Sequence, residues 1–206
     1  LMKSIEDNKL SKQQLSSYLQ QMKESLQLCQ SNTVRANELM SSFKKVAVDQ
    51  CSNNKMEFNL YEYVNDILLT LKPKLKKVPH QVSNNVGDTI TMNSYPGALA
   101  QVITNLVNNS LLHGFTDERE GHINIDATSD GETVVMEYKD DGVGMHQGQV
   151  VKAFDKYYST KMGQGGSGLG LAICKELIEG ELGGHIKLES ELEKGTKITL
   201  ELKQNV

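Results

Sequence analysis

The sequence predicts an α+β fold. We expect a two-layer α/β sandwich, whose mixed, mostly antiparallel sheet has helices on one face, preceded by a long α-helix. Three observations support this. Residues 1–52 contain neither proline nor glycine, and their apolar residues recur at helical spacing. Short segments of alternating polarity follow, interleaved with helical patterns. A glycine-rich stretch at 163–170 then leads directly into another helical pattern.

The long helix is expected over residues 12–50. Its apolar residues follow helical steps, with one slip near residues 31–33. A helix of this length must bury its apolar stripe against other helices, in a bundle or in a dimer. The polar segment 51–55 indicates a break. We therefore place a domain boundary there, with residues 1–52 as a partial helical segment and residues 53–206 as a second domain.

The second domain alternates between helix and strand patterns. Helices are expected at 61–75 and 95–113, with Pro73 in the last turn of the first and Pro96 near the first turn of the second. A further helix begins at Gly170 and ends at a glycine stop in 181–184. Alternating polarity predicts strands at 56–60, 80–86, 89–92, 122–128, 133–139, 185–189 and 197–202.

Composition narrows the class of protein. With 206 residues, 38% of them hydrophobic and 23% charged, the chain fits a soluble globular class and holds one large domain or two small ones. A net charge of −4 without a basic stripe argues against a nucleic-acid partner. The three cysteines lack C-x-x-C spacing, which favours a reducing compartment over a disulfide framework or a zinc site. No apolar run approaches the roughly 18 residues that span a bilayer.

Three polar residues form one line on the apolar 95–113 helix. Asn105, Asn109 and His113 are spaced by four residues, so each step returns to within about 40° of the same direction. Burying two amides there is costly without hydrogen-bond partners. Either these amides are solvated or satisfied in the core, or the amide oxygen of Asn109 is a ligand for Mg²⁺, which prefers oxygen and commonly bridges to nucleotide phosphates.

Two glycine-containing segments offer further contacts to a ligand. Asp140 follows a strand and precedes Gly142 and Gly144, so its carboxylate suits a hydrogen bond from a flat polar ring, although a type I′ turn explains Asp-Gly equally well. The 163–170 stretch opens a helix, where free N–H groups and the helix dipole favour phosphate. A mobile linker would have the same composition.

Five motifs stand in an order that resembles a known family. They are an N box at 105–110 (NLVNNS), a first glycine box at 140–144 (DDGVG), an F box at 154–161 (FDKYYSTK), a second glycine box at 166–171 (GSGLGL) and a Gly-Thr element at 195–196. The family is the ATP-binding domain shared by sensor histidine kinases, DNA gyrase, the large heat-shock chaperone and the mismatch-repair ATPases. The resemblance spans about residues 56–202.

The resemblance implies ATP and Mg²⁺ as ligands. It assigns Asp140 to the adenine amino group with Thr196 in support, and Asn109 to Mg²⁺ with Asn105 beside it. Residues 156–170 would form a flexible lid, in which Lys161 contacts the γ-phosphate and the N–H groups around 166–170 hold the other phosphates. The predicted ATP-binding residues are Asn105, Asn109, His113, Asp140, Gly142, Gly144, Lys156, Tyr158, Thr160, Lys161, Gly166, Gly168, Leu169, Gly170 and Thr196.

Position 105 separates the branches of this family. The ATPase members carry a glutamate four residues before the metal asparagine, where it activates water; Asn105 is a poor general base. Residues 35–50 also resemble the second helix of a kinase dimerisation hairpin. The resemblance thus favours the catalytic part of a two-component sensor histidine kinase, which transfers the γ-phosphoryl of Mg-ATP to a histidine for relay to a response-regulator aspartate. The alternatives are an ATP-hydrolysing member of the superfamily and a degenerate domain that acts only in dimerisation and docking.

The kinase interpretation implies partners and a location. It predicts a homodimer through the N-terminal helices and a response-regulator receiver domain as the partner. It also predicts a cytoplasmic location, with any inner-membrane anchor of the full-length protein outside these residues.

Two positions depart from the kinase pattern. Leu112 stands where the N box usually has a lysine, so Lys161, Lys156 or His113 must supply that phosphate contact. The phosphoacceptor motif, a histidine followed by an acidic residue and then Thr/Asn-Pro, is absent, and all five histidines lie outside the long helix. We therefore expect a fragment that begins after the acceptor helix, contains no catalytic histidine, and binds ATP without phosphorylating itself.

Overall fold

The computed structural model describes residues 12–51, 54–76, 79–115, 120–161 and 168–206. By its internal contacts the chain divides into two compact units, Leu1–Ser41 and Ser42–Val206. Among the described residues, no helix combines the length and the apolar character that crossing a membrane requires.

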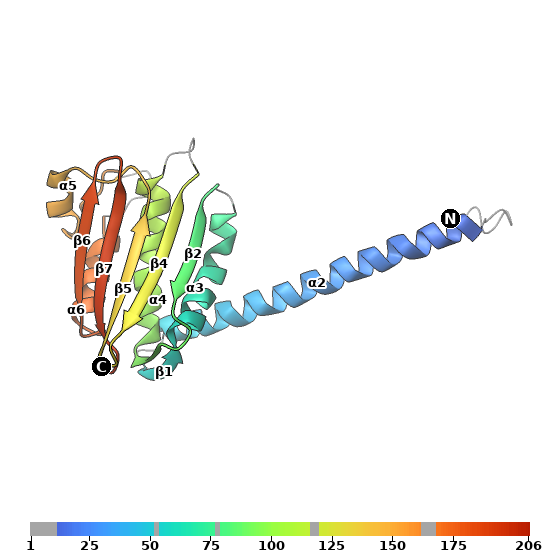
Figure 1. The fold of residues 1–206 in the computed structure, drawn as a ribbon, viewed down its shortest axis with the longest axis horizontal. Coiled ribbons are helices and arrows are strands. Elements are labelled where there is room, and N and C mark those ends of the chain that lie inside the picture. The colour runs from blue at the N-terminus through green and yellow to red at the C-terminus, as the bar shows by residue number, and fades with distance from the viewer. Residues whose placement is uncertain (1–11, 52–53, 77–78, 116–119, 162–167) are drawn as a thin grey trace. The chain divides into compact units, whose positions relative to one another are not determined.

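Helix α2 runs from Lys12 to Cys51, which confirms the predicted long helix (Figure 1). Every described side chain from residue 12 to residue 30 is exposed. The exposed side chains include six large apolar ones: Leu15, Tyr18, Leu19, Met22, Leu26 and Leu28. Apolar stripes of this kind usually pack against other helices. The domain boundary after residue 52 stays a prediction.

The second unit is built on a five-stranded sheet that is mixed and mostly antiparallel, which confirms the predicted type of sheet. The order of its strands is β2-β4-β5-β7-β6, with β2 and β4 parallel and the other neighbours antiparallel. The strands are β2 (Gln81–Val86), β4 (His122–Ser129), β5 (Thr133–Asp140), β6 (His185–Glu191) and β7 (Gly195–Lys203). A separate antiparallel pair joins β1 (Met56–Asn59) to β3 (Thr91–Ser94).

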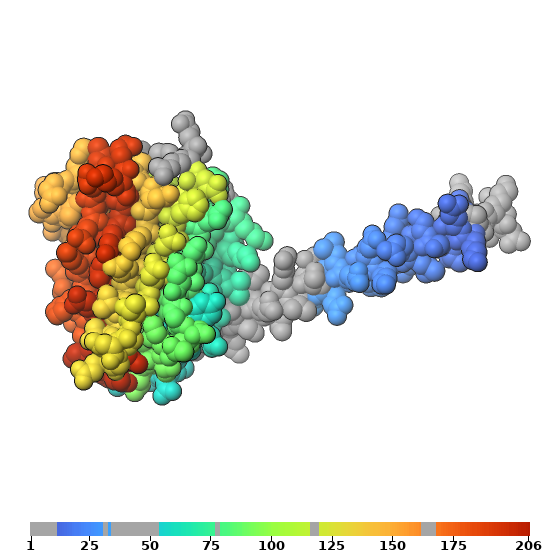
Figure 2. Space-filling model, viewed as in Figure 1, coloured from blue at the N-terminus to red at the C-terminus, as the bar shows by residue number. Residues whose placement is uncertain are grey.

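Three helices cover one face of the five-stranded sheet, which confirms the predicted sandwich (Figure 1). They are α3 (Leu60–Leu75), α4 (Pro96–Asn109) and α6 (Gly170–Glu179). Successive residues of β5 alternate strictly between half-buried and buried, and the buried apolar ones share one hydrophobic core with Leu99, Val102 and Ile103 of α4. In Figure 2 the opposite face shows the strands uncovered by helices. That face is polar, and Glu137 on it pairs with both Lys139 and Lys197.

The helix predicted to continue to His113 changes character after Asn109. Residues Ser110–Gly114 form a π-helical turn, η1, in which the N–H of Phe115 bonds to the carbonyl of Ser110 at 3.1 Å. A tertiary hydrogen bond ends the helix there, because the carbonyl of Gly114 accepts from the N–H of Val143 at 2.7 Å. Local sequence periodicity does not contain that contact.

Two other elements end or begin elsewhere than the sequence predicted, and one helix is additional. Helix α6 ends at Glu179 with Gly180 as its cap, rather than at 181–184. Strand β3 lies two residues later than expected, because its register pairs Phe58 with Met92. A short helix, α5 (Gln147–Lys152), was not predicted; its N-terminus is capped by His146 together with Gln149, whose side chain accepts from the N–H of His146 at 2.8 Å.

Candidate functional site

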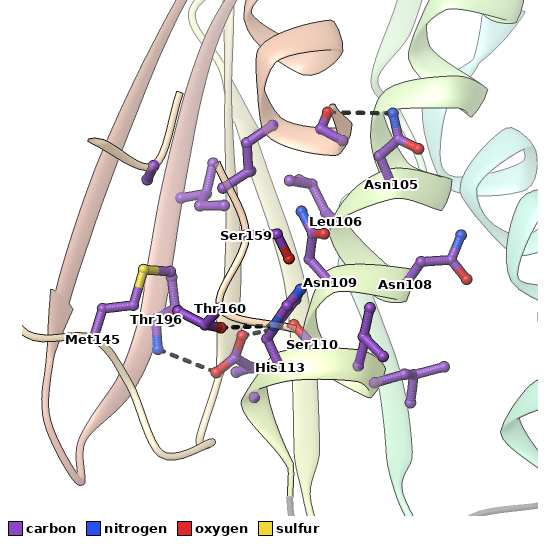
Figure 3. A pocket seen from close by; sticks show the side chains of 18 of the residues that line it. Asn105, Leu106, Asn108, Asn109, Ser110, His113, Met145, Ser159, Thr160 and Thr196 are labelled. Atoms are coloured by element: carbon purple, nitrogen blue, oxygen red, sulfur yellow. Dashed lines mark hydrogen bonds between the residues drawn. The ribbon is translucent and has the colours of Figure 1, made fainter. Parts of the chain in front are cut away.

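One cavity of about 680 Å³ opens beside α4 and η1 (Figure 3). Its wall is completed by the ends of β5 and β7, the loop after β5, the start of α6 and the segment around residues 158–160. This volume lies within the range of about 300–1,000 Å³ that is usual for small-molecule sites. The cavity therefore brings together segments that are far apart in the sequence.

Asp140 closes one end of the cavity. It is the last residue of β5 and is only 9% exposed. Its Oδ1 accepts from the backbone N–H groups of Gly142 and Thr196, each at 3.1 Å, and its Oδ2 accepts from the hydroxyl of Ser110 at 2.6 Å. Burial raises the pKa of Asp140, while these three hydrogen bonds oppose the rise and the nearby Asp141 adds to it.

A buried tyrosine stands behind this carboxylate. The hydroxyl of Tyr138 lies 2.8 Å from Ser110 Oγ and 3.2 Å from the carbonyl oxygen of Leu106. Burial raises the pKa of Tyr138 well above its usual value, so the phenol keeps its proton and acts as a donor. Tyr138, Ser110 and Asp140 thus form one hydrogen-bonded chain at this end of the cavity.

The glycine loop after β5 is not a type I′ hairpin turn. Its backbone leaves the sheet and packs between η1 and the β6–β7 connection, where the N–H of Glu193 bonds to the carbonyl of Val143 at 2.8 Å. A Cβ on Gly142 would lie 2.3 Å from the carbonyl oxygen of Gly114, and one on Gly144 would lie 2.0 Å from that of Glu191. Backbone packing therefore requires glycine at both positions.

Two asparagines of α4 face the N-terminus of α6 at the other end. Asn105 Nδ2 donates to the carbonyl of Gly170 at 3.4 Å, and a Cβ on Gly170 would lie 3.3 Å from Asn109 Oδ1. The Nδ2 of Asn109 is buried and has no hydrogen-bond partner among the described residues. Figure 3 shows both side chains on the same side of α4. An unpaired buried amide nitrogen costs free energy until a hydrogen-bond acceptor satisfies it, so Asn109 is poised for a ligand that carries acceptor atoms.

The segment after α5 is fastened to η1. Thr160 Oγ1 lies 3.1 Å from Nδ1 of His113 (Figure 3), and the ammonium of Lys161 bonds to the carbonyl of Leu112. Burial lowers the pKa of His113, and the nearby charge of Lys161 lowers it further. The N–H of Tyr157 bonds to the carbonyl of Gly168 at 2.8 Å, which joins this segment to the start of α6.

Ten of the fifteen predicted ATP-binding residues line the cavity: Asn105, Asn109, His113, Asp140, Gly144, Tyr158, Thr160, Gly168, Gly170 and Thr196. Gly142, Lys156, Lys161 and Leu169 are not among the lining residues. Lys156 instead pairs with Glu176 at 2.6 Å, with both side chains well exposed. Residues 162–167 of the predicted lid, Gly166 among them, lie outside the described residues.

Several lining residues were missed by sequence reasoning. Ser110 and Tyr138 are two, although a hydroxyl on an apolar helix and a tyrosine two residues before Asp140 were visible signals. Lys74 is a third, and its ammonium donates to Asn108 Oδ1 at 3.1 Å. No local motif marks Lys74, because only the packing of α3 beside α4 brings it to the cavity.

Residues 95–206 match the family model described as "Histidine kinase-, DNA gyrase B-, and HSP90-like ATPase". The chain belongs to this family. It is similar to the sensor histidine kinase RcsC of Escherichia coli, with 31% identity over 166 residues, 78% of this chain and 17% of RcsC. It is also similar to the sensor histidine kinase WalK of Bacillus subtilis, with 36% identity over 110 residues, 50% of this chain and 17% of WalK. The chain thus spans about a sixth of the length of these relatives.

Solved structures agree with this assignment. The catalytic domain of histidine kinase ThkA superposes with a TM-score of 0.65 at 25% identity, covering 74% of this chain and 97% of that one. Full-length ShkA in complex with AMPPNP superposes with a TM-score of 0.63, covering 96% of this chain and 40% of ShkA. Its 23% identity supports the fold alone. The second unit is therefore an ATPase-type catalytic domain of the histidine kinase family.

Proposed function

We propose that this chain binds Mg-ATP in the cavity and supplies the catalytic part of a sensor histidine kinase, transferring the γ-phosphoryl to a histidine for relay to a response-regulator aspartate. The observation that carries the proposal is one cavity with a buried acceptor, Asp140, at one end and the unpartnered, buried amide nitrogen of Asn109 at the other. The family to which the chain belongs supports the choice of nucleotide.

The residues present fit the adenine end of a nucleotide. Asp140 Oδ1 and Oδ2 already accept three hydrogen bonds, which leaves the carboxylate able to accept one more, from an amino group. Met145 and Ile198 provide apolar surface beside it for a flat ring. We assign this end to adenine.

The residues also fit a metal-bound triphosphate. Among the described residues, no group of three or more His, Cys, Asp or Glu side chains forms a metal site by itself. Asn109 offers one amide oxygen, and Mg²⁺ commonly takes one or two protein ligands together with phosphate oxygens and water. When bound, Mg²⁺ would neutralise phosphate charge, while Asn109 would orient it and the N–H groups at the start of α6 would face the phosphates.

Two lysines can supply the positive charge that Leu112 does not. Lys74 lines the cavity from α3, held by Asn108 at 3.1 Å. The ammonium of Lys161 is bonded to the backbone carbonyl of Leu112, the residue that stands in place of the usual N-box lysine. Lys156 is engaged with Glu176 and is the weaker candidate. We therefore propose Lys74, which lines the cavity, as the phosphate-facing cation, and Lys161 as a second cation that reaches the phosphates only by leaving the Leu112 carbonyl.

The geometry of Asn105 favours transfer over hydrolysis. Its amide nitrogen donates to Gly170, and an amide has no basic site for activating water. The acceptor we propose is a histidine supplied from outside these residues, on a helix that packs with α2. The exposed apolar stripe of α2, from Leu15 to Leu28, supports a homodimer through these helices.

The test supplies the missing acceptor. A polypeptide carrying an acceptor histidine helix is mixed with this chain and ATP labelled at the γ-phosphate. We expect acid-labile label on the histidine, abolished by Asn109→Ala. Label on serine, or steady release of inorganic phosphate without labelled histidine, would overturn the transfer proposal. Phosphate release alone would favour the ATP-hydrolysing alternative.

A further inference from the structure

The side chains behind Asp140 form a buried chain that the proposed chemistry does not itself use. Tyr138 is 2% exposed and Ser110 is 3% exposed. Tyr138 comes from β5 and Ser110 from the first residue of η1, so two separate layers of the fold meet at the carboxylate. Each polar atom in this buried chain has a hydrogen-bond partner. Removing one partner would leave a buried polar group unsatisfied, which costs free energy.

The distances favour one direction for the hydrogen bonds of this chain. Ser110 and Tyr138 each have one hydroxyl proton. The carbonyl of Leu106 already accepts the backbone N–H of Ser110, while Tyr138 lies nearer to Ser110 Oγ, at 2.8 Å, than to that carbonyl, at 3.2 Å. With Tyr138 donating to Ser110, the proton of Ser110 is committed to Asp140 Oδ2 at 2.6 Å.

The remaining partners of Asp140 are donors as well. Gly142 and Thr196 present backbone N–H groups to Oδ1. These two backbone N–H groups can only donate, so Oδ1 stays an acceptor, and the Ser110 hydroxyl donates to Oδ2 when Asp140 is ionised. The surroundings thus select the ionised acceptor form of Asp140 against the opposing effect of burial.

We propose that Ser110 and Tyr138 are positioning residues that keep Asp140 a pure proton acceptor, and that they thereby set the preference of this site for purine nucleotides with a 6-amino group over those with a 6-carbonyl group. Adenine has an amino donor at that position, whereas hypoxanthine and guanine have an oxygen that needs a donor. The inference rests on the proposed function, because it assumes that the base lies against Asp140.

Other charged and titratable groups lie near Asp140. They are Lys139 and Asp141 beside it in sequence, His113 of η1, His122 of β4, Glu189 and Glu191 of β6, and Lys194 and Lys197 of the β6–β7 hairpin. Burial comes first among the causes that raise the pKa of Asp140, and Asp141 adds a like charge. Removing the Ser110 hydroxyl leaves these two effects less opposed, so a protonated Asp140 would appear at higher pH than in the unaltered chain.

The test compares two nucleotides that differ at this position. Affinities for Mg-ATP and Mg-ITP are measured from about pH 5 to pH 8 for the unaltered chain, Ser110→Ala and Tyr138→Phe. We expect the ATP-to-ITP affinity ratio to fall about tenfold in Ser110→Ala and about threefold in Tyr138→Phe. In both variants the decline of ATP affinity on acidification should begin at higher pH.

Controls separate positioning from general damage. Ser94→Ala removes another fully buried serine hydroxyl, on β3 and away from the cavity lining, and should leave the ratio unchanged. Ser110→Thr restores a hydroxyl and should restore selectivity. Tyr138→Phe keeps the ring and serves as the test if Ser110→Ala does not fold. An unchanged ratio and pH profile in a folded variant overturns this inference, whereas an unaltered chain that binds neither nucleotide overturns the proposed function itself.

Discussion

The carboxylate of Asp140 accepts a hydrogen bond from the backbone N–H of Thr196 across the β5–β7 pair, at 3.1 Å. The two residues face each other in the antiparallel register, so the sheet itself sets where this carboxylate points. A side chain that is held by the pairing of two central strands is rigid, and a rigid side chain suits recognition of a base.

Asp140→Asn should weaken ATP binding without lowering the stability of the fold. Burial raises the folded-state pKa of Asp140 above its unfolded value, so its ionised form costs stability as the pH rises through the folded-state pKa. The isosteric amide removes that cost, and we expect an unfolding free energy at neutral pH that is no lower than that of the unaltered chain. Affinity for ATP should fall about 10- to 100-fold. Thermal unfolding and nucleotide titration check both outcomes, with Asp126→Asn on β4 as the matched control.

Asn109→Ala should remove the metal-dependent part of binding. Its Nδ2 is buried without a partner among the described residues, so truncation relieves an unsatisfied group and should not lower the unfolding free energy without ligand. Affinity for ATP with Mg²⁺ should fall to the value found without Mg²⁺. Asn85→Ala, on the exposed strand β2, is the control. Retained Mg²⁺ dependence in Asn109→Ala would show that another residue holds the metal.

Lys74→Gln should weaken phosphate binding selectively. The lysine lines the cavity, but its charge is solvated, so we expect only about a threefold loss of ATP affinity and no change for adenosine. The dependence of ATP affinity on salt concentration should also become shallower. Lys72→Gln, on the same helix and outside the cavity lining, is the matched control. Equal losses for ATP and adenosine would place Lys74 away from the phosphates.

The stability of the domain should depend on His113 as the pH falls. Burial lowers the folded-state pKa of His113 below the ordinary value of 6.5, and Lys161 lowers it further. The neutral imidazole therefore contributes stability that is present above the unfolded-state pKa and is lost as the pH falls through the folded-state pKa. Denaturant unfolding from about pH 7 to pH 5 should show a shallower decline in His113→Gln than in the unaltered chain or in His185→Gln. Equal slopes would exclude this linkage.

The sequence predicted the elements that depend on local pattern. Strand alternation gave β4, β5 and β7, and the line of Asn105 and Asn109 marked one wall of the cavity. What it missed depends on tertiary contacts. The π-helical turn follows from the bond between Gly114 and Val143, and the N-cap residue of α5 is His146, an uncommon residue at that position.

Charge placement was the hardest part of the site to predict. Lys156 and Lys161 stand in the expected motif, yet one pairs with Glu176 and the other with the carbonyl of Leu112. Lys74, which no motif contains, lines the cavity because α3 packs beside α4. Long charged side chains pair with the groups that tertiary packing brings within reach. Sequence spacing therefore predicts where their backbone lies but not where their charge lies.

The central claim is that one nucleotide spans the cavity from Asp140 to Asn109. Calorimetric titration with a non-hydrolysable ATP analogue, with and without Mg²⁺, tests it most directly in the unaltered chain, Asp140→Asn and Asn109→Ala. We expect one site per chain whose affinity depends on Mg²⁺, with both substitutions weakening binding and only Asn109→Ala abolishing the Mg²⁺ dependence. Absence of binding by the unaltered chain, or equal affinities in all three proteins, would contradict the account.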